Sequence, residues 1–331
     1  MIAAVILLLA SAVGIYMSCE FFVNGIEWVG QKFSVSKSAT GSVLAAFGTA
    51  LPESVVTFVA VVFGAGPAQK ELGVGAAIGG PLVLATIAYA IVGLTFVLTK
   101  EKQDKRLFSC SSTRRLIGDQ KWFLVVFAFK IGLGLIAFAI KPWLGLLFLA
   151  AYVLYVRQEM KSVDISDDDE QLEPLKIRKH EANPATLWAM AQTVGALIVI
   201  FVSSQLFVHQ LEVVGPWLGM PPQMVALLFS PIATELPEIL NAVIWVRQGK
   251  QSMALSNISG AMMIQATVPS ALGIIFTPWM LDPPLVWAAV VTMGSVFGLY
   301  VLLRTSKLSA KRLSFFGALY IVFALGLFWL A

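Results

Sequence analysis

Two short stretches place a proline and a carboxylate inside otherwise apolar segments. They are Phe47–Glu53, which reads FGTALPE, and Ile232–Glu238, which reads IATELPE. An acidic residue in a segment long enough to cross a membrane is energetically costly and is by default a functional residue. A proline inside a helix also leaves the carbonyl four residues earlier without its usual donor, here the carbonyls of Gly48 and Ala233. The two stretches therefore predict a polar site within a membrane.

The oxygen atoms of these stretches form a set suited to cations. A threonine precedes each carboxylate by four residues and so shares a helical face with it: Thr49 with Glu53, and Thr234 with Glu238. Hydroxyl, carboxylate and freed carbonyl oxygens are typical ligands of hard cations such as Ca²⁺, Na⁺ or Mg²⁺. The second stretch adds a further acid, Glu235, on the face of Glu238. We therefore expect a hard cation, and no cofactor, at this site.

The surroundings of the two acids are unequal. In the second half, a helical stripe carries amides at two of its three positions, Asn257, Ala261 and Gln265. The corresponding stripe of the first half, Ala76, Gly80 and Leu84, has no polar side chain. If the two kinked helices meet near the middle of the membrane, Glu53 and Glu238 face each other. Two such carboxylates in a low dielectric cannot both stay charged without a cation, so either a cation or a proton must bind. A purely structural pairing of the acids with Lys130 would not explain the repeated proline.

The second stretch repeats the first at one constant offset, and the flanking residues match at that offset without a gap. Matching pairs include Phe22/Phe207, Glu27/Glu212, Gly30/Gly215 and Gly64/Gly249. The chain is therefore predicted to be an internal duplication.

The elements that carry these stretches are predicted to be membrane-spanning helices. Of the 331 residues, 58% are hydrophobic and 13% are charged, and the mean hydropathy is +0.83. Apolar runs of about 20 residues, enough to cross a bilayer, recur along the chain. We predict about ten: 3–30, 41–64, 72–98, 121–140, 142–157, 185–208, 222–247, 252–276, 284–303 and 313–331. The composition thus indicates an all-α polytopic membrane protein.

Basic residues concentrate in alternate loops, while the intervening loops hold only Lys70 and Lys141. The positive-inside rule then predicts that both termini lie on the outer side of the plasma or inner membrane. Five helices in each half, an odd number, would invert the second half relative to the first. The expected units are a first repeat (1–157), a charged cytoplasmic linker (158–184) and a second repeat (185–331). Because the basic residues follow topology, we expect the lipid bilayer and inorganic cations as partners, and no nucleic acid.

Three other polar features have open interpretations. Asn24 and Glu27 share a face of the first helix, where we expect solvent or a pairing of the acid with Lys32. Lys130, halfway along the fourth helix, is either a counter-ion or occupant of a cation position, or a side chain that reaches the membrane interface. The acidic run 164–173 is either a solvated linker or a regulatory site for a divalent cation; it lacks the glycine-centred spacing of a calcium loop.

These motifs resemble those of the cation/calcium exchanger superfamily, which includes the sodium/calcium exchangers and their proton-coupled relatives. Each inverted repeat of that family carries G-T-S-x-P-E, followed by a helix that reads G-N-x-x-G-S-N-x-x-N or D. The first stretch differs only by Ala50 for serine, and the second has Ala233 for glycine and Glu235 for serine. In the following helices both serines and both middle asparagines are absent, and only Gln265 stays polar at the last motif position. The chain resembles a divergent member.

The resemblance implies alternating access and antiport, with Glu53 and Glu238 as central ligands. We therefore expect a secondary-active antiporter that exchanges Ca²⁺ or another hard cation for H⁺ or Na⁺. The loss of neutral ligands and the gain of Glu235 favour coupling to protons. The alternative is a diverged member that does not exchange calcium and either carries another solute or serves as a non-transporting membrane partner. An intramembrane enzyme is not expected, because within the predicted spans no serine–lysine or serine–histidine pair stands at helical spacing and no His-Glu metal motif is present.

Overall fold

The computed structural model describes residues 2–63, 67–99, 110–138, 140–161, 172–214, 228 and 230–330, and within these residues the chain is helical and has no β-strand. The first half contains α1 (Ile2–Lys32), α2 (Lys37–Ala39), the π-helical segment η1 (Thr40–Ala45), α3 (Ala46–Phe63), α4 (Pro67–Val83), a second π-helical segment η2 (Leu84–Ala88), α5 (Tyr89–Leu98), α6 (Cys110–Leu135) and α7 (Lys141–Lys161). The second half contains α8 (Thr186–Val214), α10 (Ser230–Thr234), α11 (Leu236–Arg247), α12 (Gln251–Phe276), α13 (Pro283–Arg304), α14 (Ala310–Ser314) and α15 (Gly317–Leu330).

Six helical stretches among the described residues are long and apolar enough to cross a membrane: Ala3–Lys32, Gly73–Leu98, Thr186–Phe207, Gln251–Phe276, Pro283–Arg304 and Ala310–Leu330. The long helices α6 and α7 are not among them. Charged side chains lower the hydropathy of α6, including Arg115, Asp119 and Lys130. The count of about ten spans therefore remains a prediction, and it enters the proposed function below.

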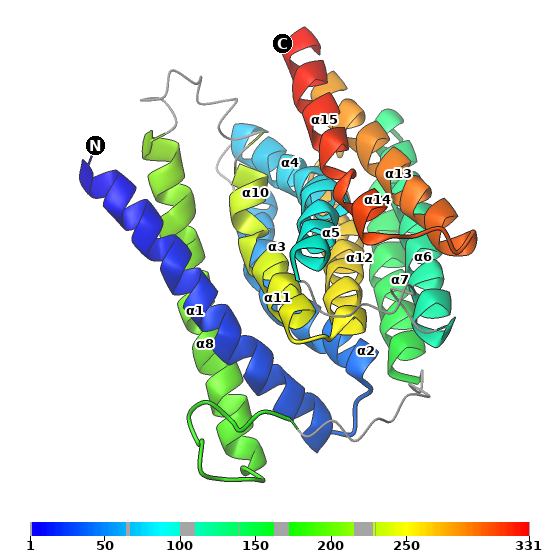
Figure 1. Cartoon of the computed structure of the whole chain (residues 1–331). Coiled ribbons are helices and arrows are strands. Elements are labelled where there is room, and N and C mark those ends of the chain that lie inside the picture. Colours follow the sequence, from blue (N-terminus) through cyan, green and yellow to red (C-terminus); the bar gives the residue numbers. More distant parts are fainter. Residues whose placement is uncertain are drawn as a thin grey trace.

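Helix α12 lies in the middle of the molecule, packed against α3, α4, α6, α7, α11 and η1 (Figure 1). Most of its residues, polar ones included, are buried, because other helices surround it on nearly every side. Close packing also depends on a missing side chain. A Cβ on Gly260 would collide with the carbonyl oxygen of Ser42 in η1. The central helix thereby carries the predicted polar stripe into the core.

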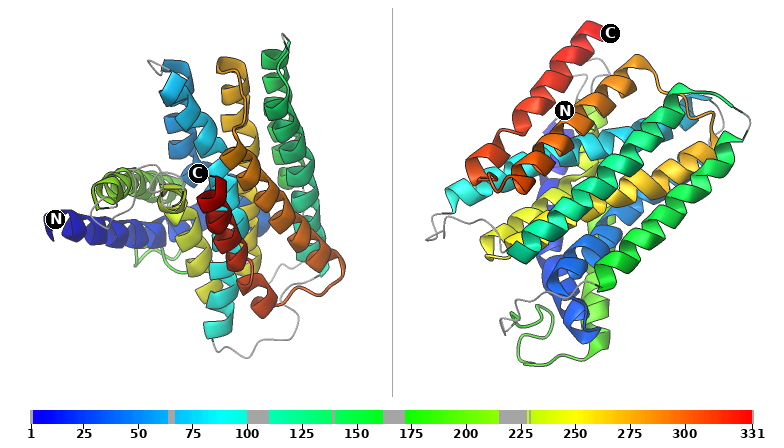
Figure 2. Two further views of the ribbon diagram at one scale, coloured as in Figure 1. Left: turned by 90° about the horizontal axis from the view of Figure 1, so that it is seen from above. Right: turned by 90° about the vertical axis from the view of Figure 1, so that its right-hand side faces the viewer.

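Helices α1 and α8 form a pair along one side of the molecule, tilted relative to the other helices (Figures 1 and 2). Small residues let the two backbones approach, since a Cβ on Gly25 would lie 2.7 Å from Oγ1 of Thr193. Large apolar side chains remain exposed on the outer faces of both helices, among them Leu9 and Val13 on α1 and Val194 and Ile198 on α8. A lipid bilayer would cover such faces.

The two chain ends lie at one end of the molecule, and the described part of the linker lies at the other (Figure 1). At the linker end, three helices finish with a basic residue in their last turn, namely Lys32 in α1, Lys161 in α7 and Arg247 in α11. We call this end the basic face. It matches the clustering of positive charge in alternate loops.

Candidate functional site

The second proline stretch breaks its helix, as its sequence predicts. Helix α10 ends at Thr234 and α11 begins at Leu236, with Glu235 between them at φ −88° and ψ 0°. Pro237 has no N–H to donate to Ala233, which stands four residues earlier. The break is short, because the amide of Glu235 still donates to Pro231 at 3.1 Å and the amide of Ile239 to Glu235 at 3.1 Å. An acid thus stands at the end of one helical segment and the start of the next.

The first stretch is built differently. Helix α3 continues through Pro52, and the irregularity lies just before it, in the π-helical turn of η1. Thr49 is buried and donates a hydrogen bond of 3.1 Å to the carbonyl of Ala45. Gly48 faces Phe22 of α1 and Leu197 of α8, each about 3.3 Å from where its Cβ would be. The Glu53 carboxylate lies outside the described residues, so its position remains a prediction.

Both acids of the second stretch are buried, with 0% of Glu235 and 1% of Glu238 exposed. Nε2 of Gln265 on α12 donates a hydrogen bond of 2.5 Å to Oε1 of Glu235. Gly80 of α4 completes this arrangement, since a Cβ there would lie 2.7 Å from Oε1 of Glu235 and 2.7 Å from Oε1 of Gln265. The structure therefore brings two of the predicted site residues together beside Gly80.

The other predicted ligands are held by local contacts. Thr234 is half-buried, and its hydroxyl donates 3.1 Å to the carbonyl of Pro231. The side chain of Ala233 lies outside the described residues. Nδ2 of Asn257 donates 3.3 Å to the backbone carbonyl of Glu238, which ties the stripe on α12 to the start of α11. A hydroxyl that donates to a carbonyl keeps lone pairs available for a cation, so both threonines retain ligand capacity.

Sequence reasoning missed the part played by Gly80. The sequence shows this glycine as an apolar position of the stripe where the resembling family has a serine, whereas its lack of a side chain leaves room for Glu235 and Gln265. The alignment of Gly80 with a serine of the resembling family was the available signal. Glu235 and Gln265, both from the second half, therefore lie where the resembling family has a serine hydroxyl in the first half.

Lys130 is fully buried, so the prediction that it reaches the membrane interface is wrong. Its ammonium donates 2.7 Å to the carbonyl of Ala77 and lies 4.7 Å from the ring centre of Phe127. Ala77 stands four residues before Pro81, so this carbonyl is the one that the proline deprives of its helical donor. The ammonium of Lys130 thereby takes the place that a dehydrated cation could have at this carbonyl oxygen. This agrees with the other interpretation of Lys130, an occupant of a cation position.

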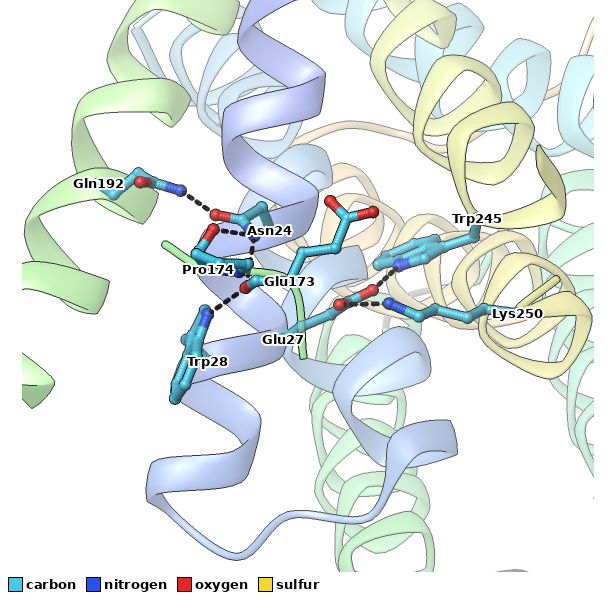
Figure 3. Close-up of polar contacts among 8 residues, drawn as sticks. All are labelled: Asn24, Glu27, Trp28, Glu173, Pro174, Gln192, Trp245 and Lys250. Atoms are coloured by element: carbon cyan, nitrogen blue, oxygen red, sulfur yellow. Dashed lines mark hydrogen bonds and ion pairs between the residues drawn. The ribbon is translucent and has the colours of Figure 1, made fainter. Parts of the chain in front are cut away.

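The polar face of α1 is not solvated. Glu27 is buried, and its expected pairing with Lys32 is wrong: it pairs with Lys250 at 2.5 Å (Figure 3). Lys32 instead donates to Oδ1 of Asn183. The sequence could not reveal this partner, because Glu27 and Lys250 lie in different halves of the chain.

Comparison with known proteins identifies the family of this chain. The profile of the family described as sodium/calcium exchanger protein matches residues 3–158 and 188–330. An uncharacterized membrane protein of Methanocaldococcus jannaschii is 24% identical over 93% of this chain and 92% of its own. A candidate antiporter, CaxA, of Alkalimonas amylolytica is 25% identical over 85% of this chain and 83% of its own.

A similar fold has been solved. The sodium-calcium exchanger NCX_Mj, in crystals soaked with Na⁺ and Sr²⁺, superposes with a TM-score of 0.74 at 22% identity, over 97% of both chains. This likeness establishes the fold, and the profile match over nearly the whole length establishes the relationship. The chain is therefore a membrane transporter, not an enzyme, and it belongs to the sodium/calcium exchanger protein family.

Proposed function

We propose that this chain is a secondary-active antiporter that exchanges Ca²⁺ or another hard cation for H⁺ or Na⁺ by alternating access. Its central ligands are the carboxylates of Glu53 and Glu238. The hydroxyls of Thr49 and Thr234 and the backbone carbonyls of Gly48 and Ala233 complete the ligand shell. Glu235 and Gln265 tune the affinity of the site. No resident cofactor is needed, because the bound cation is itself the substrate.

The observation that carries this proposal is the burial of Glu235 and Glu238 at the break between α10 and α11. A carboxylate removed from water is expensive unless a cation or a proton compensates its charge. Two such groups three residues apart give the site a strong demand for positive charge. A divalent cation and protons then compete for the same oxygens, which couples the movement of one to the movement of the other.

The contents of the site favour protons as the counter-ion. At Gly80 and Ala261 the chain lacks the hydroxyls of the resembling family, and Glu235 with Gln265 fills the space beside Gly80. Neutral oxygen ligands suit monovalent Na⁺, whereas an added carboxylate can take up a proton when the metal leaves. A site with fewer neutral ligands and one more acid is therefore better suited to H⁺ exchange.

We further propose about ten spans in two inverted five-helix repeats, 1–157 and 185–331, joined by a cytoplasmic linker, 158–184. Both termini then face outward from a plasma or inner membrane. The positive-inside rule supports this orientation, and so does the location of both chain ends opposite the basic face (Figure 1). One relative, 25% identical over 86% of this chain, is an inner membrane protein, YrbG, of Escherichia coli.

The test is cation uptake into proteoliposomes by the wild type, Glu53→Gln and Glu238→Gln. Ca²⁺, Mg²⁺, Mn²⁺, Na⁺ and K⁺ are offered under imposed pH or Na⁺ gradients. Each substitution is expected to abolish uptake of the divalent substrate, while Glu20→Gln, in a partly exposed ion pair with Lys176, serves as the matched control. Unchanged cation flux in both site variants would refute the proposed site. Uptake that follows a Na⁺ gradient and ignores a pH gradient would refute proton coupling.

The second candidate is a diverged member that does not exchange calcium, and the apolar stripe of Ala76, Gly80 and Leu84 is the observation that favours it. Folded wild-type protein that moves none of the offered cations under either gradient would select this alternative. The retained carboxylates at both Pro-Glu stretches argue for the antiporter instead.

A further inference from the structure

Helices α1 and α11 run side by side in register from the candidate site to the basic face. Sγ of Cys19 lies 3.8 Å from the carbonyl of Pro237, and Nε1 of Trp245 donates 2.8 Å to Oε1 of Glu27. In each pair the two residues are 218 positions apart in the sequence. The two helices are therefore parallel and keep a constant register over this stretch. The seam between them begins next to Glu238 and ends at Glu27.

At its lower end the seam is closed by an ion pair. Oε2 of Glu27 accepts 2.5 Å from Nζ of Lys250, the residue that precedes α12, while its other oxygen accepts from Trp245 (Figure 3). Glu27 is only 7% exposed and Trp245 is fully buried. A single carboxylate thus joins α1 to both α11 and the start of α12. The ammonium of Lys250 stands where a cation leaving along the seam would meet this carboxylate.

Between these two ends lies Asn241, three residues after Glu238 and four before Trp245. It is fully buried, and neither its amide nitrogen nor its amide oxygen has a hydrogen-bond partner among the described residues. The register of the two helices places it opposite Val23. A buried amide without partners is destabilising unless water or a ligand visits it. Along the helix axis it is about 4.5 Å beyond Glu238 and about 6 Å before Trp245, steps that one water or ion can bridge.

The opposite side of α1 is hydrogen-bonded to the linker. Nδ2 of Asn24 lies 3.3 Å from the carbonyl of Pro174, and the indole N–H of Trp28 donates 2.9 Å to that of Glu173 (Figure 3). Among the residues that the structure describes, the charged groups near Glu27 are Lys250, which precedes α12, and Glu173 from the linker, with the Glu20–Lys176 pair farther along α1. The linker holds α1 from one side, while Glu27 ties its other side to α11 through Trp245 and to the start of α12 through Lys250.

We propose that the seam between α1 and α11 is the path by which the transported cation or proton moves between Glu238 and the basic face, with Asn241 as a polar station and the Glu27–Lys250 pair as its gate. Lys250 acts as a tethered cation that neutralises Glu27 while the gate is shut. Withdrawal of Lys250 leaves the carboxylate free to attract the travelling cation. This inference rests on the proposed transport function.

The test is thiol accessibility at the station. Cys19→Ala and Cys110→Ser remove the native cysteines, Asn241→Cys supplies the reporter, and a membrane-impermeant maleimide is added to vesicles of each orientation. From the basic face, Lys250→Gln is expected to raise the labelling rate about fivefold or more, the lower end of typical couplings between separate sites. Lys250→Arg, which keeps the positive charge opposite Glu27, is expected to restore slow labelling.

Lys176→Gln is the matched control, because it breaks an ion pair on the same helix away from the seam, and it should leave the labelling rate unchanged. Val23→Cys on the facing helix replaces the reporter if Asn241→Cys does not fold. Equal labelling with and without Lys250→Gln at a folded reporter overturns the gate, even where the wild type transports. A wild type that moves no cation while labelling still responds to Lys250→Gln refutes the proposed transport function and leaves the gate standing.

Discussion

Gln265 and Glu235 are joined by a hydrogen bond of 2.5 Å from Nε2 to Oε1, although they lie 30 positions apart, one within α12 and the other at the break between α10 and α11. Both are buried in the middle of the helix bundle. The amide fixes the orientation of the carboxylate at the break between α10 and α11. It therefore connects the central helix α12 to the residues that we propose as cation ligands.

Gln265→Leu should lower the initial rate of cation uptake into proteoliposomes by about 10- to 100-fold. A hydrogen bond to a charged group contributes about 1.5–3 kcal/mol, and its loss leaves a buried carboxylate without this donor. Gln251→Leu, at the start of the same helix, is the control and should transport normally. Normal uptake by Gln265→Leu would show that the contact does not support the site.

Gly80→Ala should strongly reduce uptake, because the new Cβ would lie 2.7 Å from an oxygen of Glu235 and 2.7 Å from one of Gln265. Gly75→Ala in the same helix is the matched control, since nothing lies within 4 Å of its Cβ position. Without a steric clash, replacing a helical glycine by alanine should raise the free energy of unfolding by about 0.5–1 kcal/mol. Thermal unfolding of both variants separates stability from transport, and similar uptake by the two would contradict the crowding at Gly80.

Gly80→Ser combined with Glu235→Ser should transport better than Gly80→Ser alone. Removing the long acid vacates the space that the new hydroxyl needs, and the pair recreates the neutral oxygen ligands of the resembling family. We expect this double variant to follow a Na⁺ gradient more closely and a pH gradient less closely than the wild type. Uptake measured under each gradient separately checks this, and an unaltered preference would argue that Glu235 does not set the counter-ion.

Lys130→Met should lower the free energy of unfolding by about 1–3 kcal/mol, because the carbonyl of Ala77 then loses its donor. Pro81→Ala supplies a backbone N–H at the right position, so it should recover part of that loss in the double variant. Thermal unfolding in detergent of the two single variants and the double variant gives the coupling. Additive effects would mean that Lys130 does not compensate the proline.

Asn24→Ala should loosen the described part of the linker. The amide of Asn24 accepts from the backbone N–H of Lys176 at 3.0 Å and from Gln192 at 2.9 Å, in addition to its contact with Pro174. Limited proteolysis from the basic face should cut the linker faster in this variant than in Glu20→Gln, whose ion pair with Lys176 is partly exposed and weak. Equal cleavage rates in the two variants would show that Asn24 does not anchor the linker.

The sequence by itself determined the class of protein and the residues worth testing. Hydrophobic runs, loop charges and the two Pro-Glu stretches are local features, and the bilayer imposes the same rules on any chain. The freed carbonyl at Pro237 could likewise be predicted, because a proline acts on a carbonyl only four residues away. Whether the helix breaks there could not be predicted, since α3 continues through Pro52 of the matching stretch. The family resemblance rests on these same motifs, and the profile match confirms it.

Tertiary structure decided which side chains meet. Gln265 reaches Glu235 beside Gly80, Lys130 reaches Ala77, and Glu27 takes Lys250 in place of the nearby Lys32. None of these pairs shares a helical segment, so helical spacing could not predict them. Each depends on how closely two helices approach, which is set by small residues such as Gly80 and Gly260 and by the need of every buried polar group for a partner.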